Sequence, residues 1–346
     1  MSMETKWWKQ RKNSKDMDAH VQEASALLRE KQVVAFPTET VYGLGADATE
    51  KEAVQRIFEA KGRPADNPLI VHVADEDQVS QLVSEISPVA RKLMDEFWPG
   101  PLTLVLKSNG TAAENVTAGL STIGIRMPDH PLALSLLRKT GKPLAAPSAN
   151  RSGRPSPTTA DHVYQDLDGK IAGILDGGPT GVGVESTVVD CTTEIPIILR
   201  PGGVTKEDLE KILPQVMMDP ALADEEQKPK SPGMKYTHYA PEAPLWLVDG
   251  NDAFFSDQLH QLKKDGNRVG VIASDELAEK LSHNSLIRCG SRSQLNQVAE
   301  KLYGALREFK KSDVDLILCE TFPEEGVGAA IMNRLNKAAV KRIQTY

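Results

Sequence analysis

A proline-rich segment of mixed charge, from Pro214 to Pro244, separates two stretches of chain in which short apolar runs alternate with helical patterns. Repeated proline beside charges of both signs is typical of a linker rather than of a packed element. The length of 346 residues agrees with this division, because a single hydrophobic core rarely grows beyond about 250–300 residues. The sequence therefore predicts a first domain over residues 17–213, a linker over residues 214–244 and a second domain over residues 245–346.

The first stretch mixes strands with helices. Short apolar runs predict strands at residues 33–36, 69–73, 102–106, 122–127, 143–147, 171–176, 187–190 and 197–200. Helical spacing of apolar residues predicts helices at residues 18–31, 88–97, 132–139 and 205–213. Thr49 and Glu52 have the spacing of a capping box, which predicts a further helix ending near Lys61. This mixture predicts an α/β domain.

The second stretch has a simpler alternation. Strands are predicted at residues 245–248, 269–272, 285–288 and 314–319, with helical stretches between them, notably residues 294–310. Such a series predicts a small, parallel-sheet α/β domain with Rossmann-like winding. No G-x-G-x-x-G sequence follows its first strand, so dinucleotide binding there has no support.

The net charge of −7, from 41 Lys and Arg against 48 Asp and Glu, is unevenly distributed. Residues 1–16 carry a charge of +3, residues 17–216 carry −8 and residues 217–346 carry −2. An acidic first domain has no broad positive field to attract nucleic acid. The basic tail, with Trp7 and Trp8, is typical of a disordered end; a contact with RNA or a partner is the alternative.

The sequence also bounds the location of the protein. No run approaches the ~18 consecutive apolar residues of a membrane span, and the polar start MSMETKWWKQRKNSK does not resemble a secretory signal. The widely spaced Cys191, Cys289 and Cys319 fit small core residues in a reducing compartment, so we expect a cytoplasmic protein with no membrane partner. The seven histidines show no H-E-x-x-H pattern and no pairing with cysteine, and we expect no metal site built by the protein.

Polar and glycine-rich segments of the first domain lie where predicted strands or helices end. They are residues 37–45 (PTETVYGLG), 61–68 (KGRPADNP), 147–150 (PSAN) and 176–187 (DGGPTGVGVEST). Loops at strand ends are where α/β sheets place ligands. In addition, Arg126 lies in a predicted buried strand, and a buried arginine needs an anionic partner. The combination predicts a pocket for an anionic, phosphorylated small molecule.

Each of these features has a simpler interpretation when taken alone. Lys61 and Arg63 are placed where cations stabilise the C-terminus of a helix, and Ser148 and Asn150 are typical caps of a turn. The glycine-rich loop is also typical of a plain hairpin, and His72, in the apolar run LIVHV, of a core histidine. A Ser-His-Asp hydrolase is disfavoured because the sequence has no G-x-S-x-G nucleophile elbow.

The same residues carry a family resemblance. Lys61-x-Arg63 with Ser148-x-Asn150, framed by FPTETVYGLG at residues 36–45 and GVEST at residues 183–187, resembles the signature of the YrdC-like family. PGMKYTHYAP at residues 232–241, with a second α/β domain, is similar to the long, two-domain threonylcarbamoyl-AMP synthases of that family. The resemblance covers about residues 17–346. It implies a twisted, partly open sheet around a large cavity, plus a smaller Rossmann-like α/β domain.

The resemblance also implies a reaction. L-Threonine, bicarbonate and ATP, bound with Mg²⁺, give threonylcarbamoyl-adenylate and pyrophosphate. Threonylcarbamoyl-transferase proteins then pass the group to tRNA next to the anticodon, so contact with tRNA is mostly indirect. Two alternatives stay open: an RNA-binding module of the same fold, and a carbamoyl-adenylate-forming enzyme such as the domain of hydrogenase maturation proteins.

Carried over position by position, the resemblance implies a set of site residues. Catalytic roles fall on Lys61, Arg63, Ser148 and Asn150. The L-threonine site matches Thr40, His72, Arg126, Ala146 (through its backbone) and Ser186. The ATP site matches Arg63, Asn67, Thr122, Ser148, Ser156, Arg200 and Tyr236. Because Tyr236 lies in the linker, the resemblance implies that the linker closes over the cavity as a lid and shields the product from water.

Overall fold

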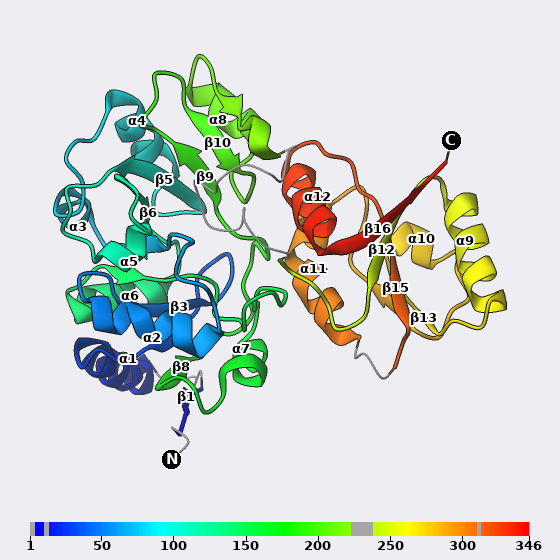
Figure 1. Cartoon of the computed structure of the whole chain (residues 1–346), viewed down its shortest axis with the longest axis horizontal. Coiled ribbons are helices and arrows are strands. Elements are labelled where there is room, and N and C mark those ends of the chain that lie inside the picture. Colours follow the sequence, from blue (N-terminus) through cyan, green and yellow to red (C-terminus); the bar gives the residue numbers. More distant parts are fainter. Residues whose placement is uncertain (1–3, 10–13, 223–237, 310–312, 346) are drawn as a thin grey trace. The chain divides into compact units, whose positions relative to one another are not determined.

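The computed structural model describes residues 4–9, 14–222, 238–309 and 313–345 (Figure 1). The chain forms two compact units. Unit 1 comprises the described residues of Met1–Ser152, Ser156–Gly181 and Glu185–Tyr236, and unit 2 those of Gly153–Pro155, Val182–Val184 and Thr237–Tyr346. The predicted domain limits at residues 213 and 245 stay predictions, because much of the linker lies outside the described residues.

Unit 1 is built on a mixed sheet. Its strands, in spatial order, are β1 (Lys6–Trp8), β8 (Gly173–Leu175), β2 (Val34–Phe36), β3 (Gly43–Asp47), β7 (Leu144–Ala145), β4 (Ile70–His72), β6 (Thr122–Arg126), β5 (Leu102–Lys107), β9 (Thr187–Asp190), β10 (Ile197–Arg200) and β11 (Met217–Met218). Strands β4 and β6 are parallel, whereas β5 and β6 are antiparallel. The predicted α/β class is confirmed.

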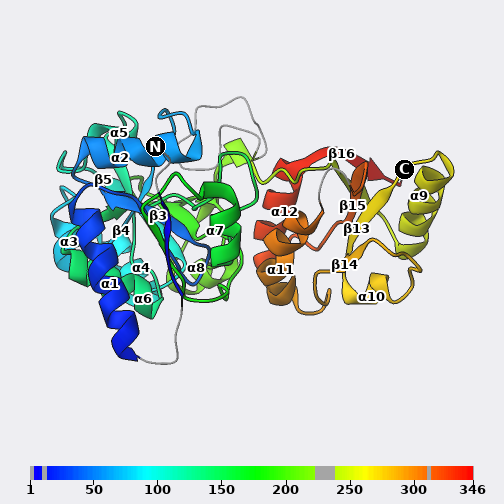
Figure 2. The same ribbon diagram turned by 90° about the horizontal axis from the view of Figure 1, so that it is seen from below.

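Helices cover this sheet. They are α1 (Ser14–Arg29), α2 (Lys51–Lys61), α3 (Glu76–Ser80), α4 (Pro88–Phe97), α5 (Glu114–Thr117), α6 (Pro131–Thr140), α7 (Ala160–Leu167) and α8 (Lys206–Ile212), followed by the 3₁₀ turn η1 (Pro220–Leu222). The largest apolar core joins one face of the sheet to α2, α4, α7 and α8. On the opposite face, α1 and α6 pack together over β2 and β8 (Figure 2).

Helix α2 starts later than the sequence predicts. Its N-cap is Glu50, whose side chain makes no capping hydrogen bond, while the Thr49 hydroxyl donates to Asp47 Oδ1 at 2.7 Å. The predicted capping box is therefore wrong, because the Thr49 hydroxyl donates to the carboxylate of Asp47 and does not accept a hydrogen bond from the first turn of the helix. At the other end, Gly62 adopts a left-handed conformation (φ 61°) that ends the helix and turns the chain toward Arg63.

The basic tail contributes an edge strand. β1 pairs in parallel with β8, and the Trp8 side chain is only 5% exposed, within the core beneath α1. A Cβ added to Gly173 would lie 2.4 Å from the Trp8 ring, so the sheet meets the indole at a position that has no side chain. The expectation of a disordered end is wrong for Lys6–Trp8, because burial of the indole stabilises an ordered strand.

Unit 2 is a parallel sheet with helices on both faces, which confirms the predicted class. The strand order is β14 (Leu286–Arg288), β13 (Val269–Ala273), β15 (Leu316–Glu320), β12 (Leu245–Asp249) and β16 (Ala339–Gln344), and every adjacent pair is parallel. Helices α9 (Asp252–Lys264) and α10 (Asp275–Ala278) lie on one face, and α11 (Leu295–Glu308) and α12 (Val327–Ala338) on the other (Figures 1 and 2).

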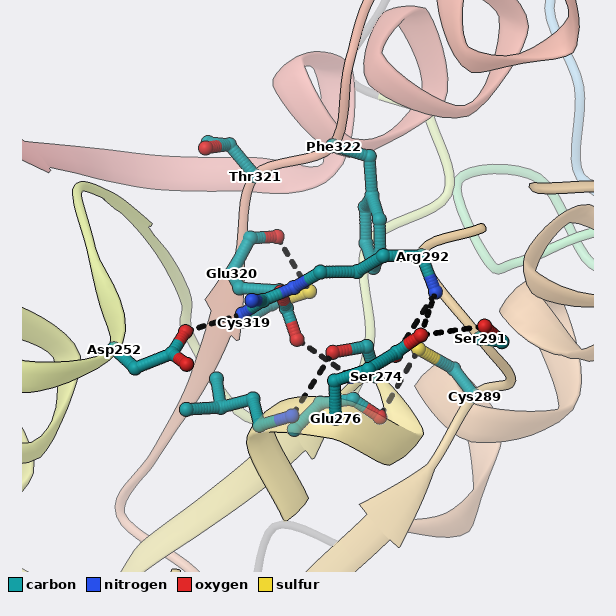
Figure 3. A network of polar contacts seen from close by, with 12 residues as sticks. Asp252, Ser274, Glu276, Cys289, Ser291, Arg292, Cys319, Glu320, Thr321 and Phe322 are labelled. Atoms are coloured by element: carbon teal, nitrogen blue, oxygen red, sulfur yellow. Dashed lines mark hydrogen bonds and ion pairs between the residues drawn. The ribbon is translucent and has the colours of Figure 1, made fainter. Parts of the chain in front are cut away.

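An ion-pair network ties the carboxyl ends of these parallel strands together (Figure 3). Arg292 lies between two carboxylates, 2.7 Å from Asp252 Oδ1 and 2.5 Å from Glu320 Oε2. The backbone N–H of Ser274 donates to the other oxygen of Glu320. Each charge has a counter-charge from another element, so the network holds loops in place rather than presenting a bare charge to a ligand.

Cys191, Cys289 and Cys319 are all buried free thiols. Across the described ranges, no helix combines the length and apolarity that crossing a membrane requires.

Candidate functional site

Strand alternation separates the two faces of the unit 1 sheet, of which one joins the large apolar core. In β6, Ile123 and Ile125 enter the large core, whereas Thr122, Gly124 and Arg126 face the other way. The residues of this second face in neighbouring strands include His72 of β4, Thr103 of β5 and Val188 of β9. A narrow cavity on this face is lined mainly by apolar residues, and Thr103 and Thr122 are its polar members. The alternation thus brings Arg126, His72 and Thr103 together on the part of this face that lies beyond α1 and α6.

Arg126 is the charged centre of this face. The residue is 4% exposed, its Nε donates to Gly100 O at 3.2 Å and its Nη1 donates to Thr40 Oγ1 at 2.9 Å. Its Nη2 lies 2.6 Å from Glu39 Oε1. The sequence predicts an anionic partner for a buried arginine, and the structure supplies Glu39 from within the chain.

His72 lies beside Arg126, because the two residues are register partners in parallel strands. Its ring is 4% exposed and meets Phe36 edge-on, with centroids 5.9 Å apart. Burial, with a smaller contribution from the charge of Arg126, lowers the pKa of His72 to about 3. Its Nδ1 has no hydrogen-bond partner within the described part of the chain. The imidazole is therefore neutral near pH 7 and keeps one unused polar atom.

Ser186 and Arg200 form a second polar group on this face. The Ser186 hydroxyl lies 2.8 Å from Thr103 Oγ1, and Arg200 donates to both the carbonyl and the hydroxyl of Ser186. The loop after β10 packs directly on the backbone of Glu185 and Ser186: a Cβ added to Gly202 would lie 2.3 Å from Glu185 O. Only glycine allows that approach, which fixes the backbone between Ser186 and Arg200.

Lys61 contacts the Ser148-x-Asn150 segment, with which the family resemblance pairs it. Lys61 is 2% exposed, and its ammonium donates to Ser148 O and to Asn150 O, each at 2.6 Å. The Ser148 hydroxyl donates to Asn150 Oδ1 at 2.6 Å. The ammonium thus holds the backbone of this segment in a fixed turn.

The remaining predicted residues are distributed around these groups. Arg63 reaches toward the carbonyl oxygens of Asn67 and Pro68, each at 3.4 Å from its Nη2. The Asn67 side chain is 1% exposed, and neither of its amide atoms has a hydrogen-bond partner among the residues that the structure describes. A buried amide without partners is costly, so Asn67 is a candidate ligand contact.

The structure also places Ala146 and Ser156, two other predicted residues. Ala146 already donates its N–H to Ile70 O at 2.9 Å, which leaves its carbonyl for a ligand. The Ser156 hydroxyl donates to Glu185. Tyr236 lies outside the described residues.

Sequence reasoning missed Glu39 and Thr103. Glu39 lies between the predicted Thr40 and the turn residue Thr38, and an acid within an otherwise uncharged loop after a buried strand is the signal that could have found it. Thr103 interrupts the apolar run LTLVL, where period-2 alternation places it on the same face as Arg126.

Comparison with known proteins shows the family of the chain. Residues 26–202 match the family model described as Telomere recombination (Sua5, YciO and YrdC), and residues 204–340 match that of the threonylcarbamoyl-AMP synthase C-terminal domain. The threonylcarbamoyl-AMP synthase of Bacillus subtilis (strain 168) is 55% identical, with 94% of each chain covered. That of Pyrococcus abyssi is 46% identical over 92% of this chain and 94% of the relative. The chain belongs to the threonylcarbamoyl-AMP synthase family.

Membership makes the protein an enzyme of the adenylate-forming transferase type. A solved structure of P. abyssi Sua5 complexed with L-threonine is 43% identical, covers 99% of both chains and has a TM-score of 0.91. The predicted YrdC-like fold with a C-terminal α/β domain is confirmed by this similarity.

Proposed function

We propose that the chain makes threonylcarbamoyl-adenylate and pyrophosphate from L-threonine, bicarbonate and ATP. The names of its relatives support the product, and the L-threonine held by the P. abyssi protein supports the amino acid. The observation that carries the proposal is Arg126, a buried guanidinium that contacts Thr40 and lies beside the neutral ring of His72. Such a guanidinium is suited to an amino-acid carboxylate, which it can bind through two parallel hydrogen bonds.

In this proposal the amino-acid site is the part of the sheet face that carries Arg126, His72 and Thr103. Arg126 binds the carboxylate of threonine, while hydroxyl and imidazole groups surround the rest of the molecule. The contacting residues are Thr40, His72, Ser186 and the backbone of Ala146. The short distance between Ser186 and Thr103 supports a preformed pocket, because the two hydroxyls already hold each other in place.

The nucleotide site in this proposal uses the loops around α2 and β7. Asn67, with its unpartnered amide, offers hydrogen bonds to the nucleotide, and Arg63 offers charge to its phosphates. Lys61 fixes the turn that presents Ser148 and Asn150. The other proposed contacts are Thr122, Ser156, Arg200 and Tyr236.

The chemistry follows from this arrangement. The threonine ammonium gives up a proton to solvent, and the free amine then condenses with bicarbonate to a carbamate with release of water. The carbamate carboxylate attacks the α-phosphate of ATP in line and expels pyrophosphate. The enzyme aligns these groups and stabilises charge on the phosphoryl oxygens, for which Arg63 and the Ser148 segment supply donors. Mg²⁺ would arrive with ATP, held by phosphate oxygens and water; the described residues contain no group of three His, Cys, Asp or Glu suited to a metal ion.

The product is a labile mixed anhydride that must be consumed by transfer. We propose that threonylcarbamoyl-transferase proteins deliver its threonylcarbamoyl group to tRNA next to the anticodon, so that contact between tRNA and this chain is mostly indirect. The net negative charge of residues 17–216 supports this indirect role, because these residues offer no broad positive field to attract RNA.

Pyrophosphate release from ATP tests the proposal. We expect release only when L-threonine and bicarbonate are both present, together with a product of the mass of threonylcarbamoyl-adenylate. Arg126→Met should abolish the release of pyrophosphate with L-threonine, whereas Arg91→Met, which alters an exposed ion pair, should leave that release unchanged. Release with carbamoyl phosphate in place of threonine would favour the carbamoyl-adenylate enzyme, and RNA binding without turnover would favour the RNA-binding module.

A further inference from the structure

Glu39 is held against Arg126 by its own turn. The Thr38 hydroxyl donates to Val41 O at 2.7 Å and closes the loop after β2. The Glu39 carbonyl accepts a hydrogen bond from the N–H of Gly181 at 3.1 Å, which ties the loop to the glycine-rich segment. The backbone is therefore fixed on both sides of Glu39, and its carboxylate is directed to the predicted amino-acid site rather than to solvent.

The contact between Glu39 and Arg126 is close but incomplete. The two side chains are 14% and 5% exposed, and Oε1 lies 2.6 Å from Nη2. Neither oxygen of Glu39, nor Nη2 of Arg126, has a properly aligned hydrogen bond to another described residue. Both groups therefore keep hydrogen-bonding capacity that no described residue uses, in a place where unused capacity is costly.

The charges around this pair are complementary to a free amino acid. Burial lowers the pKa of both His72 and His130, the two histidines near the pair, so both rings are neutral near pH 7. At the contact itself, one cation, Arg126, then faces one anion, Glu39. An α-amino acid carries one carboxylate and one ammonium, so it can replace the internal ion pair by two new ones without any change in net charge.

We propose that Glu39 binds the ammonium group of the amino acid and neutralises Arg126 while the site is empty. The substrate carboxylate takes the place of the Glu39 carboxylate on Arg126, and Glu39 turns to the substrate ammonium. This inference rests on the proposed function, since it concerns the same amino-acid site. It explains why a buried carboxylate without aligned hydrogen bonds is placed beside the one guanidinium that the substrate needs.

Calorimetric titration with two ligands tests the role of Glu39. L-Threonine carries both charges, whereas (R)-3-hydroxybutyrate has the same carboxylate and hydroxyl but lacks the amino group. Glu39→Gln should weaken L-threonine binding about tenfold or more, because it removes a charge-assisted contact. The same variant should bind (R)-3-hydroxybutyrate at least as well as the wild type, because Arg126 loses its internal competitor.

Glu52→Gln is the matched control, since it removes the same charge from a side chain that is 80% exposed. It should change neither affinity. Glu39→Asp keeps the charge on a shorter side chain, so it should retain part of the preference for threonine. ATP affinity and circular dichroism report whether each variant is folded.

Equal weakening of both ligands in Glu39→Gln, or unchanged binding of threonine, would overturn the inference and leave the proposed function standing. A fall in threonine affinity as large in Glu39→Asp as in Glu39→Gln would also count against it, because a recognition role depends on charge. A wild-type protein that binds no L-threonine would overturn the proposed function itself, and this inference with it.

Discussion

Lys61 carries its positive charge almost out of reach of solvent. Its ammonium donates to two carbonyl oxygens of the Ser148-x-Asn150 segment, so its first effect is to shape a backbone turn. A lysine that merely stabilised a helix C-terminus would point to solvent. The family resemblance pairs the two motifs but does not say how they meet, because a contact across 87 positions depends on the whole sheet.

Lys61→Met should therefore reduce both turnover and stability. The buried carbonyl oxygens lose a charged donor, which costs about 1–3 kcal/mol of unfolding free energy. Turnover should fall at least about 100-fold, since the donors of Ser148 and Asn150 lose their positions. Urea unfolding and pyrophosphate release measure the two effects. Lys51→Met, at a side chain 72% exposed in the same helix, is the control and should be within about 0.5 kcal/mol of wild type.

His72 makes the stability depend on pH. Its pKa is lowered to about 3 in the folded chain, whereas the unfolded chain has an ordinary value near 6.5. Between these values the unfolded state binds the extra proton, so the free energy of unfolding falls as the pH drops, by about 1.4 kcal/mol per pH unit from this group. Relative to wild type, His72→Gln should lose less stability between pH 7 and pH 5 in urea titrations. An identical pH dependence in both proteins would refute the assignment; His260→Gln, at an exposed histidine, is the control.

The elements show where local pattern suffices. Helix α4 and strands β9 and β10 have the predicted limits, because an N-cap serine, a proline and continuous apolar runs define them locally. Strands β1 and β3 were missed: one has a single buried tryptophan, and the other, GLGAD, contains two glycines. Such short strands are stabilised by their neighbours in the sheet rather than by their own propensity.

The edge strand β1 gives a prediction at this scale. Trp8→Ala should destabilise unit 1 by about 3–5 kcal/mol, as expected for loss of a buried large aromatic side chain. Gly173→Ala should weaken the same contact, because the added methyl group overlaps the Trp8 ring. Thermal unfolding of the full chain measures both effects. Lys9→Ala, at an exposed neighbour, should have no effect; if Trp8→Ala were equally silent, the tail would not be part of the fold.

At the scale of the whole molecule, composition and alternation predicted two α/β units and the parallel sheet of the second. They could not predict that Gly153–Pro155 and Val182–Val184 belong with unit 2, because membership of a unit depends on contacts distant in sequence. The site was predicted through a resemblance, whereas the physical argument alone reached only a pocket for an anion. Glu39 shows the limit of that argument: the anion beside Arg126 comes from the chain itself.

The ion-pair network of unit 2 supplies the last prediction, because its effect should stay within that unit. Arg292→Met leaves Glu320, whose side chain is 5% exposed, without its cation. The cost should be about 2–3 kcal/mol, below that of a fully buried pair since Arg292 is 35% exposed. Hydrogen exchange should accelerate in α9, α10 and β13 but not in unit 1. Arg268→Met breaks an exposed pair of the same unit and should change exchange little. Faster exchange throughout both units would mean that they unfold as one.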